Sequence, residues 1–267
     1  MKNLYVGWQD QATREWIPVA KLERSDAGYK LTYTAGAHRC QGFSGLGRMT
    51  KLDASYFSPD LFPFFENRII KKSRPEYKKY LEWIGIENLD PDPLKILQVT
   101  GGIRSTDNFE LFSTPSYNGK NLCLEFFPRG LRYTHTKAID DINNLSNNTP
   151  LFVMHDLQND FDKAALLLRT NEPSINIGYI PKYYNKGLKK LLDSGIDARV
   201  LILQVNKDAP IDMRILCRLE INASPDIVDL LTINEDFSDW HSDAISATNE
   251  SHLNDIATTL NFGDSSN

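Results

Sequence analysis

Alternating hydrophobic and polar residues dominate the first 35 positions of this 267-residue chain. The segments LYVGW (residues 4–8) and YKLTYT (29–34) place every second side chain on one face, which predicts antiparallel strands. The turn residues Ser25-Asp26-Ala27-Gly28 separate two such strands. The glycine-rich stretch at 38–48 is predicted to be a loop.

The period of the pattern becomes helical between residues 58 and 101. Ser58 and Pro59 are typical of a helix start, and an apolar stripe runs from Leu61 to Ile70. A second helix is predicted from Ser73 to Gly85, and a third from Pro91 to Val99. The segment FELF (109–112) then returns to strand character.

Strands dominate again after the polar segment PSYNGK (115–120), which predicts a domain boundary. One helix, KYYNKGLKKLLDSG (182–195), interrupts them. The expected strands are residues 122–127, 151–156, 164–169, 175–181, 199–205 and 213–221. The loop DDINNLSNNTP (140–150) separates the first two of these. The pattern therefore predicts an α+β fold with domains at 1–116 and 120–232, followed by an acidic, flexible tail at 233–267.

The net charge of −5 is unevenly distributed along the chain. Residues 225–267 hold nine acidic residues and no Lys or Arg, so residues 1–224 carry +4. A mildly basic body can bind nucleic acid even when the whole protein is acidic. The tail is interpreted as a solubilising extension, with an autoinhibitory role as the alternative.

Several function classes lack the sequence features that they require. No apolar run approaches the length of a membrane span, and the first residues lack the apolar core of a secretory signal. Cys40, Cys123 and Cys217 are too widely spaced for a metal pair or a disulfide framework, which favours a cytoplasmic location. No hydrolase or zinc-protease motif is present. We therefore expect a protein without enzymatic activity, with no catalytic residues, no metal and no cofactor.

Three segments between Gly130 and Leu192 resemble a HIRAN domain, a small β-barrel module attached to DNA-repair enzymes. They are GLRY at 130–133, LQNDFDKAALLLR at 157–169, and INIGYIPKYYNKGLKKLL at 175–192. The resemblance implies a small β-barrel with a flanking helix that captures the 3′ end of a single DNA strand. It makes this chain a candidate DNA-binding module for single-stranded or frayed ends.

The resemblance also implies roles for individual residues. Arg132 and Tyr133 would line the pocket, with the ring of Tyr133 stacking on a terminal base. In the turn that is usually NPYD in the family, Asn159, Phe161 and Asp162 keep the pattern. Asp162 would accept a hydrogen bond from the 3′-hydroxyl.

Each of these roles has a structural alternative. Tyr133 could be a buried strand aromatic with Arg132 on the surface, and the Asn159–Asp162 segment could be only a turn between strands. Asp160 replaces the usual proline and adds a charge that repels phosphate.

Residues 178–190 provide a second ring and a basic stripe. Tyr179 would stack on a base, and Lys182 would contact a phosphate near the helix start, where free amides already favour anions. Auxiliary basic residues follow along the helix: Lys186, Lys189 and Lys190. The alternative is a solvated lysine-rich helix face.

Residues 3–115 resemble the N-terminal subdomain of HipA-type proteins. The matching features include LYVGW, DLFPFFENRII (60–70) and TGGIRSTDNFELF (100–112). No kinase catalytic loop follows, so the resemblance implies an interaction module and no kinase activity. The expected partners are a single-stranded DNA 3′ end and a separate effector or HipA-like protein, with no membrane, in phage defence or a toxin–antitoxin system. The main alternative is an antitoxin-like regulator of a HipA-type kinase with a degenerate DNA pocket. A second alternative is an enzyme of unrecognised type.

Overall fold

A five-stranded antiparallel sheet forms the N-terminal half of the computed structural model, which describes residues 2–133, 136–227 and 235–238. Its strand order is β4-β3-β2-β1-β5. The strands are β1 (Lys2–Gln9), β2 (Trp16–Ser25), β3 (Gly28–Tyr33), β4 (Tyr56–Ser58) and β5 (Phe109–Phe112). Alternate side chains of β3 are buried, as the sequence pattern predicts, and pack with Leu22, Phe65 and Leu97.

Four short helices accompany this sheet: α1 (Ala35–Arg39), α2 (Pro63–Glu66), α3 (Tyr77–Trp83) and α4 (Pro93–Thr100). Asp92 caps α4, because its Oδ1 accepts a hydrogen bond of 3.0 Å from the Leu94 amide. Gly101 ends α4 with a φ of 71°, which glycine adopts without strain. The predicted helix starting at Pro59 is wrong, because β4 runs to Ser58 and α2 starts only at Pro63.

A seven-stranded antiparallel sheet forms the C-terminal half, in the order β10-β9-β8-β11-β12-β7-β6. Its strands are β6 (Ser116–Tyr117), β7 (Leu122–Phe126), β8 (Pro150–His155), β9 (Leu166–Arg169), β10 (Asn176–Tyr179), β11 (Ala198–Val205) and β12 (Ile215–Ile221). The helices are α5 (Thr136–Asn143) and α6 (Lys182–Asp193). Three 3₁₀ turns accompany it: η1 (Leu131–Tyr133), η2 (Ile211–Met213) and η3 (Pro225–Ile227). A further turn, η4 (Glu235–Phe237), packs against α1 and β2 of the N-terminal half. Helix α5 occupies the start of a segment that the sequence predicted to be a loop.

This sheet curls until its edge strand β10 meets the chain that follows β7. Arg129 and Tyr179 exchange two backbone hydrogen bonds, of 2.8 and 2.9 Å. Gly178 makes the approach possible, because a Cβ atom at this position would lie 2.5 Å from the Arg129 carbonyl oxygen. The result is a closed, barrel-like arrangement with α6 packed on its core through Tyr184, Leu188 and Leu191.

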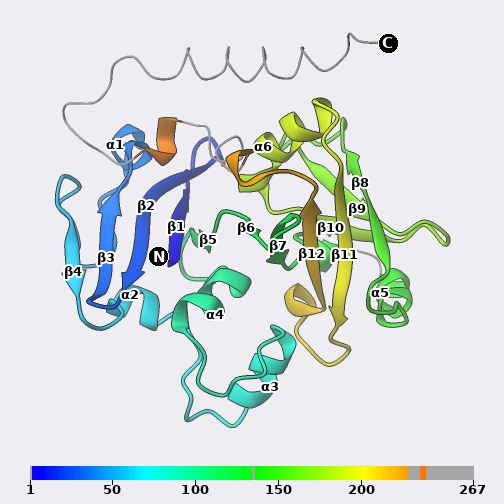
Figure 1. Cartoon of the computed structure of the whole chain (residues 1–267), viewed down its shortest axis with the longest axis horizontal. Helices are drawn as coiled ribbons and strands as arrows, with labels where there is room; N and C mark the ends of the chain where they lie inside the picture. Colours follow the sequence, from blue (N-terminus) through cyan, green and yellow to red (C-terminus); the bar gives the residue numbers. More distant parts are fainter. Residues whose placement is uncertain (1, 134–135, 228–234, 239–267) are drawn as a thin grey trace.

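The two sheets lie side by side with α4 and α6 near their junction (Figure 1). Phe112 of β5 stacks on Tyr183 of α6 with ring centroids 4.3 Å apart, and it belongs to the core of the C-terminal half. Helix α3 packs on Phe127 and Leu216 in a separate small core. The structure is therefore mixed α/β with two antiparallel sheets. The acidic tail predicted at 233–267 lies outside the described residues except for 235–238.

A candidate nucleic-acid cleft between the two sheets

A cleft of about 1010 Å³ opens where the two halves of the chain meet. All seven residues that the sequence predicts to contact DNA line it: Arg132, Tyr133, Asn159, Phe161, Asp162, Tyr179 and Lys182. They come from three separate segments, which are η1, the β8–β9 loop and the β10–α6 junction. The fold thus brings together side chains that lie up to 50 positions apart in the sequence.

Two aromatic rings stand in solvent at this cleft. Tyr133 is 87% exposed at the end of η1, and Phe161 is 86% exposed in the β8–β9 loop. The alternative of a buried strand aromatic is therefore wrong for Tyr133. Exposing large rings costs hydrophobic free energy, and exposed rings offer a face on which any base can stack.

The turn that carries Phe161 is held by Asn159. Its Oδ1 accepts hydrogen bonds from the amides of Phe161 (3.0 Å) and Asp162 (2.9 Å). This is the local side-chain turn that the sequence offered as the structural alternative. In this conformation Asn159 shapes the turn, and the carboxylate and the ring that follow it face the cleft.

Asp162 is held by two donors. Its Oδ1 accepts from the Ala164 amide at 3.0 Å, and its Oδ2 accepts from Asn185 Nδ2 at 2.8 Å. Asn185 is only 2% exposed and also lines the cleft. Among the described residues its Oδ1 has no hydrogen-bond partner. The carboxylate is thus fixed in place by a buried amide whose own acceptor remains available.

Arg132 is neutralised by an acidic residue that the sequence did not single out. Its Nη2 is paired with Asp212 Oδ2, and its Nε lies 3.3 Å from Asp212 Oδ1. The hydrogen bond to Asp212 raises the pKa of Arg132. Arg132 therefore lines the cleft without contributing net positive charge.

Tyr179 is bonded to a second carboxylate of the cleft. Its hydroxyl donates to Asp156 Oδ2 at 2.9 Å, and this hydrogen bond lowers the pKa of Asp156. Burial raises the pKa of Tyr179, and the contact with Asp156 adds to the shift. The ring of Tyr179 is half-buried, so it offers less free surface than the rings of Tyr133 and Phe161.

Lys182 is the first residue of α6 and forms no ion pair among the described residues. Its Nζ donates to two backbone carbonyls, those of Phe161 (3.0 Å) and Arg14 (3.2 Å).

The auxiliary lysines of α6 do not line the cleft. Lys186 pairs with Glu15 at 3.7 Å and Lys189 with Asp193 at 2.5 Å, while Lys190 lies in the last turn of the helix.

The charges that line the cleft balance closely. Its basic residues are Arg14, Arg68, Arg129, Arg132 and Lys182, and its acidic residues are Glu110, Asp156, Asp160, Asp162 and Asp212. Three of the arginines are held in ion pairs: Arg68 with Asp107, Arg129 with Glu110, and Arg132 with Asp212. Of the basic residues that line the cleft, Arg14 and Lys182 are therefore the two that are not held in ion pairs among the described residues.

Sequence reasoning missed Asn185 and every residue that the N-terminal half contributes to the cleft. A signal for Asn185 exists, because it is a polar residue three positions before Leu188 on the buried face of α6. No comparable signal points to Arg14 or Ile103, because their place in the cleft depends on how the two sheets pack.

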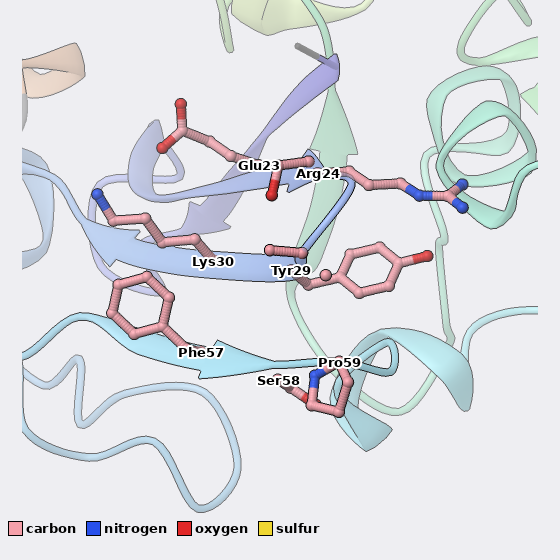
Figure 2. Close-up of a pocket in the computed structure, with 10 residues that line it drawn as sticks. Glu23, Arg24, Tyr29, Lys30, Phe57, Ser58 and Pro59 are labelled. Carbon is pink, nitrogen blue, oxygen red and sulfur yellow. The ribbon is translucent and has the colours of Figure 1, made fainter.

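A second hollow of about 560 Å³ crosses strands β2, β3 and β4 (Figure 2). Lys30 lies over the ring of Phe57 at 5.9 Å, and Arg24 forms a 2.6 Å ion pair with Asp92. The larger cleft, where the predicted residues gather, is therefore the better candidate site.

Within the described residues, no group of three or more His, Cys, Asp or Glu side chains could hold a metal ion. None of the helices in that part of the chain is long and apolar enough to cross a membrane. All three cysteines are free.

Comparison with known proteins identifies one family. Residues 121–224 match the family model of the HIRAN domain. A search of curated proteins finds no match. Two solved structures are similar to parts of the chain. One is a protein from Lactobacillus plantarum, at 15% identity and a TM-score of 0.30, covering 39% of this chain and 99% of that chain. The other is the HIRAN domain of human HLTF, at 16% identity and a TM-score of 0.32, covering 47% and 100%. The match to the family model supports the HIRAN resemblance predicted from the sequence over residues 121–224, which are less than half of the chain.

Proposed function

We propose that this chain binds the 3′ ends of single-stranded or frayed DNA and brings a separate effector to them. The observation that carries the proposal is the meeting of two exposed rings and one fixed carboxylate in a single cleft. Tyr133 and Phe161 supply the stacking faces, and Asp162 supplies the acceptor. The HIRAN match over residues 121–224 supports DNA as the ligand.

End selectivity would come from Asp162. A carboxylate repels the phosphates along a strand, so its place in a DNA cleft is favourable only where the strand ends in a hydroxyl. That hydroxyl donates a charge-assisted hydrogen bond, which contributes roughly 1.5–3 kcal/mol. An ionised 3′-phosphate lacks the donor and adds repulsion.

The bases would be bound with little sequence preference. Stacking on an aromatic ring is open to every base and contributes roughly 1–3 kcal/mol per base. Among the described helices, α6 is the longest, and it contributes only Lys182 and Asn185 to this cleft, whose volume suits only a few nucleotides. The protein would act without chemistry of its own, with residues 1–116, which resemble a HipA-type subdomain, as the surface for the effector.

Two oligonucleotides that differ only at the 3′ terminus test the proposal. Fluorescence anisotropy should give a dissociation constant at least about tenfold weaker for the 3′-phosphate than for the 3′-hydroxyl, a difference of about 1.4 kcal/mol. A circular single strand of the same sequence is the control without an end, and it should bind at least as weakly as the phosphate. Equal binding of all three would refute end capture.

Two observations favour a second function, that of an antitoxin-like regulator. Asp212 neutralises Arg132, and Asp160, which is 92% exposed at its side chain, adds negative charge beside the predicted pocket. Both features weaken an interaction with phosphate. Calorimetric titration of the full chain against a HipA-type kinase, set beside the DNA assay, separates the two functions.

A further inference from the structure

Residues from the N-terminal half of the chain line part of the cleft. Arg14, Trp16, Tyr80, Thr100, Gly102 and Ile103 line it, and none of them belongs to the HIRAN domain. We call the part formed by Asp10–Trp16 the hairpin wall, because it is the tip of the β1–β2 hairpin. The cleft is therefore composite, and a strand bound on the HIRAN side would also face this wall.

The hairpin wall is fixed against α6. Lys182 Nζ donates to the Arg14 carbonyl at 3.2 Å, and Lys186 pairs with Glu15 at 3.7 Å. In the lining of the cleft, Arg129 is paired with the buried Glu110 of β5, and the Tyr183 hydroxyl donates to the same carboxylate at 2.9 Å. These contacts join the two halves of the chain and hold the hairpin wall in place relative to α6.

Arg14 has an unusual backbone for its residue type. Its φ is 60°, in the left-handed region that non-glycine residues rarely adopt. The tip is held in this shape by Asp10, whose Oδ1 accepts from the amides of Ala12 (2.9 Å) and Thr13 (2.7 Å). Strained positions of this kind gather where a side chain must be presented in one place.

The charge of Arg14 is available to a ligand. In the described part of the chain it forms no ion pair, and its side chain is exposed at the cleft. On the HIRAN side, Asp156, Asp160 and Asp162 line the cleft, whereas Arg132 is already neutralised. Lys182 alone would leave that side negative, so Arg14 supplies positive charge that the HIRAN domain lacks.

We propose that Arg14 and Lys182 form a phosphate subsite between the hairpin wall and α6. The ligand is one backbone phosphodiester of the strand whose terminal base lies on Tyr133. This inference rests on the proposed function, and it gives the N-terminal half a direct part in binding DNA. Arginine suits the role, because its guanidinium binds two phosphate oxygens at once and stays charged.

Variants of Arg14 in the full chain test the subsite. Arg14→Gly removes the charge and relaxes the backbone, because glycine adopts a φ of 60° without strain. We expect it to weaken binding of a 3′-hydroxyl strand about tenfold, and to reduce the log–log salt slope by about 0.7, the value for one lost phosphate contact to a single strand. Arg14→Lys should retain the slope. Arg48→Ala, at an exposed position outside the cleft, is the control and should change neither quantity.

The possible outcomes separate this inference from the proposed function. If Tyr133→Ala weakens binding while Arg14→Gly leaves affinity and salt slope at their original values, the phosphate subsite is refuted and end capture stands. If the wild-type protein binds no DNA strand, both the proposed function and the phosphate subsite are refuted. Unchanged thermal unfolding of Arg14→Gly would show that a loss of affinity does not come from a loss of fold.

Discussion

Asn185 holds Asp162 through a 2.8 Å hydrogen bond from its amide nitrogen to Oδ2. The first residue lies buried on α6, and the second lies in the β8–β9 loop, so the bond connects the rigid helix to the turn that carries Phe161. Because a buried amide orients the carboxylate, its position does not depend on the ligand. Pre-positioned acceptors of this kind favour one donor geometry over others.

The first prediction concerns charge at this carboxylate. Asp162→Asn should narrow the difference between 3′-hydroxyl and 3′-phosphate strands to less than about threefold, because the repulsion of the phosphate is removed. Asp160→Asn is the matched control, since it removes the same charge from a side chain that is 92% exposed on the same turn. Asp160→Asn should strengthen the binding of both strands alike and leave the ratio of their dissociation constants unchanged. An unaltered ratio in Asp162→Asn would contradict the role of Asp162, with anisotropy titrations as the measurement.

The second prediction concerns the two exposed rings. Tyr133→Ala and Phe161→Ala should each weaken both kinds of strand alike by about 1–3 kcal/mol of lost stacking. Neither should change the free energy of unfolding by more than about 0.5 kcal/mol, because both side chains are more than 85% exposed. Phe57→Ala, at a ring that is 72% exposed on β4 outside the cleft, is the control. Equal losses of affinity at Phe57 and Tyr133 would show that the rings act only through general surface hydrophobicity.

The third prediction concerns protonation beside Tyr179. The tyrosine hydroxyl holds the pKa of Asp156 below its ordinary value, so Tyr179→Phe should raise that pKa. Because the folded-state pKa is the lower one, the contact stabilises the fold above the unfolded-state pKa, and its contribution is lost as the pH falls through the folded-state pKa. The variant should therefore lose stability at neutral pH, and this loss should shrink as the pH falls through the folded-state pKa of Asp156. Carboxyl chemical shifts followed through an NMR titration measure the pKa directly, and an unshifted Asp156 would contradict the hydrogen bond.

The sequence predicted most strands of both sheets because alternation and turn residues are local signals. In β3 and β7 every second side chain is buried, which is the pattern that the sequence shows. Helix α2 was misplaced because the apolar stripe from Leu61 to Ile70 imitates a helix, whereas Phe62 is extended before Pro63 and the helix ends at Glu66. Helix α5 was missed because its polar residues resemble those of a loop.

The residues of the candidate site likewise fall into those that the sequence predicted and those that it did not. The residues on the HIRAN side were found from three short segments, because the family resemblance connected them. The pairing of Arg132 with Asp212 joins positions 80 apart in the sequence, and the hairpin wall belongs to the other sheet. Such contacts depend on tertiary packing, which periodicity does not encode. The resemblance of residues 3–115 to a HipA-type subdomain stays a prediction.

The fourth prediction concerns closure of the barrel at Gly178. Its φ is 97°, and an added Cβ would lie 2.5 Å from the Arg129 carbonyl oxygen, which bonds to the neighbouring Tyr179 amide. Gly119 is a matched control, because its φ is 93° and nothing lies within 4 Å of an added Cβ. Both alanine variants place a non-glycine residue at a similar positive φ, which costs about 1–2 kcal/mol. The excess cost of Gly178→Ala therefore measures the clash that separates β10 from the chain after β7.

We expect Gly178→Ala to lower the free energy of unfolding by at least about 2 kcal/mol more than Gly119→Ala in urea titrations. Tyr179 and Lys182 of the cleft follow Gly178 in the chain. Loss of barrel closure in Gly178→Ala should therefore also lower the affinity for DNA, whereas Gly119→Ala should leave it unchanged. Equal unfolding energies in the two variants would show that the barrel does not depend on this close approach.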